Sequence, residues 1–161
     1  MKDLDDAKKT AADYIARRRR TGKELADRLK KAGYDEEIIS QTAEWAEVYG
    51  FIDDAQYARI FIEEQLRSHK YGIDRIVREL KHRGIDSFTL EDVFAEFEQP
   101  DEVQILVELL KKKIGNERDR KTVDRAVRHF VTRGYRFSDI YEALGRLRLE
   151  IEQGEDDAFE Q

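Results

Sequence analysis

An internal repeat of about fifty residues limits the fold of this chain more than any other feature. Gly33, Gly84 and Gly134 lie 51 and 50 residues apart, and each follows a stretch in which apolar residues have helical spacing. Superposing the three stretches on these glycines aligns the apolar residues Leu25, Ile76 and Ala126 and, one turn later, Leu29, Leu80 and Phe130. A helical pattern with this period is typical of stacked repeats, each of which buries its apolar side against the next.

The stretch from residue 17 to 49 shows the unit that repeats. Thr21 and Glu24 have the spacing of a capping box, in which a hydroxyl and a carboxylate satisfy each other's backbone donors at a helix start. Gly33 ends that helix, and Asp35 begins the next. The aligned positions Gly72 and Thr122 are expected to start the middle helices of the later units, as Thr21 does in the first. We also expect the third helices to align at Ile39, Leu90 and Ile140, at Ala43, Phe94 and Leu144, and at Ala46, Phe97 and Leu147.

The predicted fold is all-α, an elongated array of three tandem three-helix repeats without strands. The repeats are expected at residues 1–50, 51–99 and 100–149, with Pro100, the single proline, at the second boundary. Residues 150–161 form an acidic tail that is too polar to bury a core, and we expect it to be disordered.

Charge and composition exclude several classes of protein. The 30 basic and 36 acidic residues give a net charge of −6, and six of those acids lie in the tail, so the rest of the chain is balanced. The sequence lacks cysteine, an apolar run long enough to span a membrane, and a cleavable leader. We therefore expect a cytoplasmic protein that does not bind membranes.

The sequence offers little support for an enzyme. His69, His82 and His129 are far apart and lack metal-ligand spacing, and the glycines form no phosphate-binding loop. Asp53 and Asp54 could form an acid pair or bind a metal, but capping of the helix that follows them explains them more simply. We expect no enzymatic activity, no metal and no cofactor.

Clustered cations are the stronger functional signal. They occur near the junction of the first and second helices of each unit and at the end of each middle helix, the latter set including Arg128 and His129. Aligned in stacked repeats, they would form rows suited to phosphates or to an acidic protein groove. The alternative is that they only complement helix dipoles and keep the surface soluble. The candidate partner- or DNA-binding residues are Arg17, Arg18, Arg19, Arg20, Lys30, Lys31, Arg67, Lys70, Lys81, Arg83, Lys111, Lys112, Lys113 and Arg133.

The aromatic residues divide into two groups. Most lie on apolar stripes and are expected in the core, namely Trp45, Tyr57, Phe61, Phe94, Phe97 and Phe130. Tyr14, Tyr71 and Tyr135 lie near the basic clusters and are candidates for contact with a partner.

Several motifs together resemble one known family. The run RTGKELADRLKKAGY at 20–34 resembles the signature of the RecX family, the regulators of the RecA recombinase. GFIDD at 50–54, LKHRGI at 80–85 and RGY at 133–135 agree with it in order and spacing, over about residues 8–149. The chain departs from the family pattern in having Thr21 where serine is usual, a denser arginine block, and the acidic tail.

The resemblance implies a non-enzymatic modulator of homologous recombination, DNA repair and the SOS response. Family members resemble elongated three-helix repeats that lie in the groove of the RecA–DNA filament and limit its growth, strand exchange and co-protease activity. Carried over by position, the contact residues would be Arg18, Arg20, Lys30, Lys31, Lys81, Arg83 and Arg133. We expect a monomer whose partners are the RecA filament and DNA, with weak binding to DNA alone. A stand-alone DNA-binding protein and a helical scaffold for another protein are the alternatives.

Overall fold

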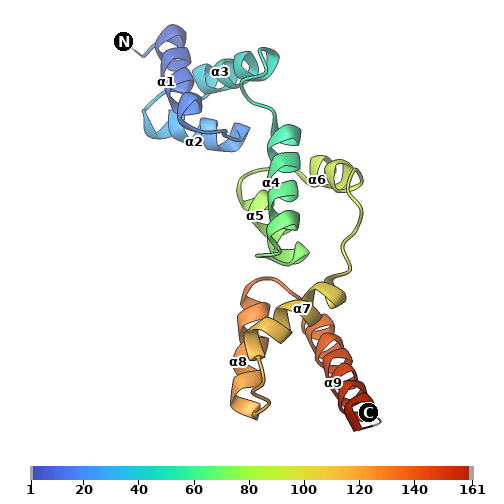
Figure 1. Cartoon of the computed structure of the whole chain (residues 1–161). Coiled ribbons are helices and arrows are strands. Elements are labelled where there is room, and N and C mark those ends of the chain that lie inside the picture. Colours follow the sequence, from blue (N-terminus) through green and yellow to red (C-terminus); the bar gives the residue numbers. More distant parts are fainter. Residues whose placement is uncertain (1, 160–161) are drawn as a thin grey trace. The chain divides into compact units, whose positions relative to one another are not determined.

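In the computed structural model, the backbone of residues 2–159 and the side chains of residues 2–148 are described, and all regular structure in this part is helical (Figure 1). The helices are α1 (Leu4–Arg17), α2 (Gly22–Lys31), α3 (Glu36–Val48), α4 (Asp54–Ser68), α5 (Ile73–His82), α6 (Ser87–Phe94), α7 (Glu102–Ile114), α8 (Arg120–Thr132) and α9 (Phe137–Phe159). They follow one another in three sets of three, which confirms the all-α helical-repeat fold predicted from the sequence.

The last helix is longer than the sequence indicated. We expected helical structure to end near residue 149 and a disordered tail to follow, but α9 continues to Phe159. The residues of this extension are mostly Glu, Gln, Ala and Asp with a single glycine, Gly154. Glu, Gln and Ala are strong helix formers, and a polar helix needs no apolar face to continue from one that is already packed.

Contacts between residues group the chain into two compact units. Unit 1 consists of Met1–Glu64 and Val77–Phe97, and unit 2 of Gln65–Ile76 and Glu98–Gln161. In unit 1, α1, α2 and α3 all pack against one another, and in unit 2, α7 packs against both α8 and α9 (Figure 1). The division passes through α4 and α5, so the middle set of helices contributes to both units.

Helix starts confirm most of the predicted caps. The backbone N–H of Glu24 donates to Thr21 Oγ1 at 3.1 Å, and the Thr21 N–H donates to Glu24 Oε2 at 3.2 Å, which completes the capping box. Asp35 caps α3 as expected. The expectation for Thr122 was wrong, because Asp119 caps α8 and accepts from the Thr122 N–H at 3.1 Å. An aspartate is at least as good an N-cap as threonine, and its charge also complements the helix dipole.

The core confirms the alignment of the middle helices. The six aligned residues are all at most 5% exposed, namely Leu25, Leu29, Ile76, Leu80, Ala126 and Phe130.

The third helices bury Ala46, Leu90, Ile140 and Leu147 as expected, but at their middle aligned position the buried residue comes one position earlier. Ala43, Phe94 and Leu144 are only partly buried, whereas the preceding residues Thr42, Val93 and Ala143 are buried. Thr42 can be buried because its hydroxyl donates to the Ile38 carbonyl at 2.7 Å.

A junction between consecutive middle helices organises unit 1. The N-terminus of α2 lies against the C-terminus of α5: the Thr21 hydroxyl donates to the Arg83 carbonyl at 2.6 Å. The next backbone donor, the Gly22 N–H, reaches Asp54 Oδ1 of α4 at 2.9 Å. Helix N-termini leave backbone N–H groups without intrahelical partners, and here a later part of the chain accepts from one of them.

Unit 2 contains the same junction fifty residues further on. The Gly72 N–H donates to the Arg133 carbonyl at 2.9 Å, and the Ile73 N–H donates to Glu102 Oε1 of α7 at 2.6 Å. In both units, therefore, an arginine backbone carbonyl and a side-chain carboxylate accept hydrogen bonds from the start of the preceding middle helix.

Close backbone approach at each junction requires glycine. Gly84 and Gly134 have φ near +87° and +88°, a region that favours glycine. A Cβ at Gly84 would overlap the Cβ of Lys23, and one at Gly134 would overlap the Cβ of Arg75. Neither neighbour can move aside without shifting its backbone, since the overlapping atom is itself a Cβ.

We predict that Gly84→Ala destabilises the protein more than Gly50→Ala does. Gly50 also has a positive φ, +73°, but no atom lies within 4 Å of its added Cβ. Gly50→Ala should therefore cost only the strain of a left-handed alanine, about 1–2 kcal/mol. Gly84→Ala should cost about 1–3 kcal/mol more, because it also overpacks the junction. Urea unfolding of both variants measures this, and equal costs would show that the junction is not tightly packed.

Candidate functional site

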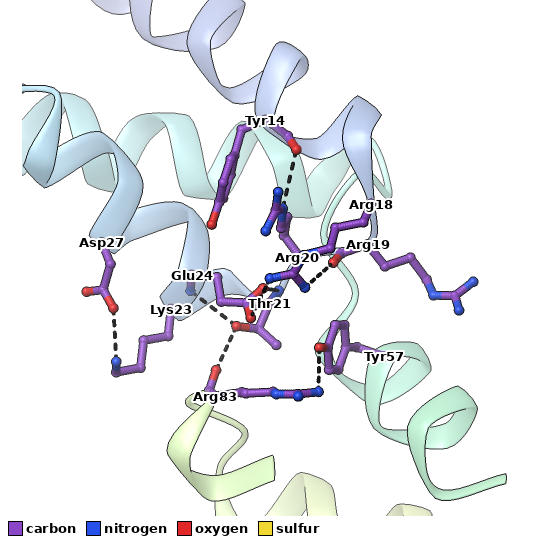
Figure 2. A network of polar contacts seen from close by, with 10 residues as sticks. All are labelled: Tyr14, Arg18, Arg19, Arg20, Thr21, Lys23, Glu24, Asp27, Tyr57 and Arg83. Atoms are coloured by element: carbon purple, nitrogen blue, oxygen red, sulfur yellow. Dashed lines mark hydrogen bonds and ion pairs between the residues drawn. The ribbon is translucent and has the colours of Figure 1, made fainter. Parts of the chain in front are cut away.

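The arginine block lies in unit 1, between the end of α1 and the start of α2 (Figure 2). Its members have different surroundings. Arg20 turns back onto Tyr14, with its guanidinium carbon 3.8 Å from the ring centroid and its Nε donating to the Tyr14 carbonyl at 3.3 Å. Arg18 forms an ion pair with Glu24 at 3.5 Å, and Arg19 forms one with Glu64 at 3.8 Å. Arg20 is thus held within the fold, whereas Arg18 and Arg19 are exposed.

Arg83, just after α5, lies beside this block (Figure 2). Its carbonyl takes part in the unit 1 junction, and its side chain extends over α4. Arg83 Nη1 donates to the Tyr57 hydroxyl at 2.9 Å, and the guanidinium carbon lies 4.6 Å from the centroid of the Phe61 ring. Backbone and side-chain contacts together fix the position of this cation.

Arg83 and the arginine block border an open groove of about 450 Å³, which we call the unit 1 groove. Its lining is aromatic and apolar along α4, with arginines around it and one acid. The lining residues are Arg18, Arg19, Tyr57, Ile60, Phe61, Glu64 and Arg83. Aromatic rings combined with arginine are the composition enriched in the parts of protein interfaces that contribute most binding energy.

Unit 2 has a second groove, of about 580 Å³, which we call the unit 2 groove. Its lining includes the Tyr71 ring, His129, Thr132 and no carboxylate, and its Lys and Arg residues are Lys70, Arg75, Arg125, Arg128 and Arg133. The guanidinium carbon of Arg75 lies 4.0 Å from the centroid of the Tyr71 ring. This groove is therefore strongly cationic.

The two grooves occupy corresponding positions in consecutive repeats. Arg19 and Lys70 are 51 residues apart, and Arg83 and Arg133 are 50 residues apart, which are the spacings of the repeat. Each groove therefore combines a cation that follows the first helix of one repeat with the arginine that ends the middle helix of the next. The fold places five of the predicted residues in a groove. Arg18, Arg19 and Arg83 lie in the unit 1 groove, and Lys70 and Arg133 lie in the unit 2 groove.

The other nine predicted cations all lie outside both grooves. Those in the last turn of a helix are Arg17, Lys30, Lys31, Arg67, Lys81, Lys111, Lys112 and Lys113, and all are exposed. Lys111 forms an ion pair with Glu108 at 3.2 Å. Their position agrees with the alternative stated above, that cations at helix ends complement the dipole.

Three residues of the unit 2 groove were missed by reasoning from sequence, namely the cations Arg75 and Arg125 and the neutral Thr132. Arg75 and Arg125 lie inside helices rather than in a run of cations, so they did not stand out. The available signal was helical spacing, because Arg125, Arg128 and Thr132 fall at i, i+3 and i+7 on α8 and therefore share one face.

One of the three aromatic contact candidates is a core residue instead. Tyr135 is 4% exposed, and its hydroxyl donates to the His69 carbonyl at 2.9 Å. Burial raises the pKa of the Tyr135 hydroxyl to about 12, so it remains a proton donor. Tyr14 and Tyr71 are partly buried, and each has an arginine over its ring.

The described residues contain no cluster of three or more His, Asp or Glu side chains that could hold a metal ion. His129 lies in the unit 2 groove, where partial burial, and then the nearby Lys113 and Arg133, lower the pKa of its imidazole. Among the described helices, none has the length and apolar character needed to cross a membrane.

The carboxylates of the two junctions are electrostatically unusual. Burial raises the pKa of Asp54 and of Glu102, although each accepts a backbone N–H bond that acts in the opposite direction. Nearby acids add to the shift, among them Asp86 for Asp54 and Asp139 for Glu102. Each junction therefore combines a partly desolvated acid with the backbone carbonyl of an arginine, Arg83 or Arg133, whose side chain borders a groove.

Comparison with known proteins gives consistent matches. A family model described as RecX, first three-helix domain, matches residues 7–45, and one described as RecX, second three-helix domain, matches residues 53–93. The regulatory protein RecX of Caldanaerobacter subterraneus subsp. tengcongensis is 31% identical over 143 residues, which cover 88% of this chain and 71% of that protein. The regulatory protein RecX of Bacillus licheniformis is 30% identical over 156 residues, which cover 93% of this chain and 59% of that protein. The crystal structure of RecX from Lactobacillus salivarius has the same fold, with a TM-score of 0.74 and 22% identity, and the match covers 91% of this chain and 97% of that one.

We predict that replacing the junction acids by amides changes how stability depends on pH. A carboxyl whose folded pKa is raised stabilises the fold below its unfolded pKa, and this contribution is lost as pH rises through the folded pKa. In the Asp54→Asn/Glu102→Gln variant neither side chain titrates, so stability is not lost in this way. The amide oxygens can still accept the N–H bonds from Gly22 and Ile73. The stability of this variant relative to the wild type should therefore increase as pH rises from about 4 towards neutrality.

Asp119→Asn provides a control of opposite sign. Hydrogen bonds from Thr122, first from its hydroxyl and then from its backbone, lower the pKa of Asp119. Its contribution to stability is present above the unfolded pKa, so this variant should lose stability relative to the wild type as pH rises. Urea midpoints across the pH range measure both differences, and parallel profiles for the two variants would contradict the assignment of Asp54 and Glu102.

Proposed function

Because the chain belongs to the RecX family of regulatory proteins, we propose that it regulates the RecA recombinase, and that its effect is inhibitory. In this proposal it is not an enzyme. It acts in the cytoplasm as a monomer, binds in the groove of the RecA–DNA filament, and limits filament growth, strand exchange and co-protease activity. Through these effects it would modulate DNA recombination, DNA repair and the SOS response.

The recurrence of one groove at the same position in consecutive repeats is the observation that best supports this proposal. A nucleoprotein filament presents protein and phosphate surfaces together. The unit 1 groove, with Tyr57 and Phe61 beside arginines, has a composition suited to a protein surface. The unit 2 groove, lined by cations without a carboxylate, is suited to phosphates.

A stand-alone DNA-binding protein is the second candidate function, and the unit 2 groove is the observation in its favour. The balanced charge of residues 1–149 and the acidic residues beyond them count against it, because non-specific DNA affinity comes mainly from neutralised phosphates. Strong, steeply salt-dependent binding to DNA without recombinase, combined with no effect on RecA, would favour this candidate.

We predict that the protein inhibits the single-stranded-DNA-dependent ATPase of RecA at well below one molecule per recombinase. Blocking filament growth acts on a whole filament, so a few molecules suffice, whereas simple competition for subunits needs near-equal amounts. The measurement is a titration of the protein into RecA on single-stranded DNA. No effect at excess protein would remove the proposed function, and stimulation would remove its inhibitory direction.

A pair of variants with the same loss of charge tests the unit 1 groove in this assay. Arg18→Gln/Arg19→Gln removes two exposed cations that border the groove, and Lys30→Gln/Lys31→Gln removes two exposed cations outside it. Loss of an interface residue that contributes strongly typically costs about 2 kcal/mol or more, which is about thirtyfold in affinity. The first variant should therefore inhibit much less than the second. Equal losses would indicate that only net charge matters.

We also predict that deleting residues 150–161 strengthens binding to bare DNA at low salt. This segment carries Glu150, Glu152, Glu155, Asp156, Asp157 and Glu160, which would compete with phosphates for the basic surface. The gain should shrink as salt rises, since salt screens both interactions. The deletion also shortens α9, which runs to Phe159. A variant with all six acids changed to amides keeps the chain length and should bind as the deletion does. Unchanged binding in both variants would retire the idea.

A further inference from the structure

Three arginines of the unit 2 groove lack an ion-pair partner among the described residues, although Arg125 interacts electrostatically with Asp119 at the start of α8. Arg125, Arg128 and Arg133 form no ion pair with any carboxylate in the described part of the chain, in contrast to Arg18 and Arg19 at the unit 1 groove, which are paired with acids. Arg125 and Arg128 are also exposed. A surface of this kind attracts a polyanion, because each guanidinium that pairs with a phosphate releases condensed counterions.

The cations of α8 are arranged along a line. Arg125, Arg128 and Thr132 recur at helical spacing on one face and line the groove together with His129. Arg125 and Arg128 lie about one turn apart on this face, whereas the Thr132 hydroxyl already donates to the Arg128 carbonyl at 2.9 Å. The spacing of the two arginines suits a chain of regularly spaced anions more than it suits a single ion.

Apart from Tyr71, the lining of the unit 2 groove contains no apolar residue. The Tyr71 ring is partly buried, and Arg75 stacks on it with its guanidinium carbon 4.0 Å from the centroid. The unit 1 groove instead has Tyr57, Ile60 and Phe61 in its lining. An acidic peptide would need apolar pockets of that kind to bind tightly, and the unit 2 groove does not offer them.

From these contrasts we infer that the unit 2 groove binds a single strand of nucleic acid, with its phosphates on Arg125, Arg128 and Arg133 and a base stacked at Tyr71. Cationic grooves that contain an aromatic platform are the general solution for single strands, since every base has a face that can stack. The unit 1 groove, at the same position of the preceding repeat, does not share this role. This inference deepens the proposed function by naming the DNA-contacting site, but it concerns binding without recombinase.

The test is binding of a fluorescently labelled oligothymidylate to the full chain alone, measured by fluorescence anisotropy over a series of salt concentrations. The logarithm of the affinity should fall linearly with the logarithm of salt concentration. Arg125→Gln/Arg128→Gln removes two phosphate contacts, so the slope should become less steep by about 1.4, or about 0.7 for each contact with a single strand. Affinity at low salt should fall about tenfold or more.

Lys30→Gln/Lys31→Gln is the matched control, because it makes the same change in net charge at two exposed lysines outside both grooves. It should leave the salt slope nearly unchanged. Thermal unfolding of both variants checks that they fold, which is expected since Arg125 and Arg128 are exposed. Equal loss of affinity and slope in the two double variants would overturn the assignment, as would no measurable binding by the wild type.

Tyr71 gives a readout that charge alone would not move. Tyr71→Leu should lower affinity about tenfold without changing the salt slope, and Tyr71→Phe should restore it, because stacking needs the ring and not the hydroxyl. Failure of Tyr71→Phe to restore binding would overturn the stacking part of the inference.

Competition separates the classes of ligand. Unlabelled single strands should displace the labelled oligonucleotide better than duplex DNA or polyglutamate does. Displacement by polyglutamate or duplex at equal or lower concentration would overturn the assignment to a single strand. The RecA assay does not depend on these measurements. Failure of single-strand binding would therefore not refute the proposed regulation of RecA, and failure of the RecA assay would not refute single-strand binding.

Discussion

The start of one middle helix, held by groups from the following repeat, is the interaction on which both compact units depend. Two features coincide at each junction: an arginine carbonyl accepts a hydrogen bond from Thr21 or Gly72, and a carboxylate accepts the next backbone N–H. A buried donor without a partner would cost about 1–3 kcal/mol, so these contacts decide whether the helix start can be buried. The glycine that follows each arginine allows the close approach.

The same junction determines where the candidate grooves lie. Arg83 and Arg133 contribute their carbonyls to the junctions. Their side chains therefore lie beside the end of the first helix of the preceding repeat, next to Arg18 and Arg19 after α1 or Lys70 after α4. The scaffold fixes one cation at each site, and the neighbouring helices give each groove its own chemistry. In unit 1 the neighbour is the aromatic face of α4, and in unit 2 it is the basic face of α8.

The sequence predicted the helices and their order well, because caps, turn glycines and apolar periodicity are local signals. It also predicted the buried positions of the middle helices. It failed where the outcome depended on distant groups: Tyr135 can be buried because the His69 carbonyl, from the preceding repeat, accepts a hydrogen bond from its hydroxyl. Arg75 and Arg125 were overlooked for a related reason, since each becomes part of a groove only when separate helices meet. Runs such as Lys111–Lys113 were easy to see, yet they lie outside both grooves.

The junctions also give the series of repeats a direction. At each one the earlier repeat supplies the donors and the later repeat supplies the acceptors, so the two partners have unlike roles. The middle repeat does both, accepting through Asp54 and Arg83 and donating through Gly72 and Ile73. Exchanging the order of two repeats would therefore bring together surfaces that lack the matching groups. The series of repeats is therefore polar, because at each junction the donors belong to the earlier repeat and the acceptors to the later one.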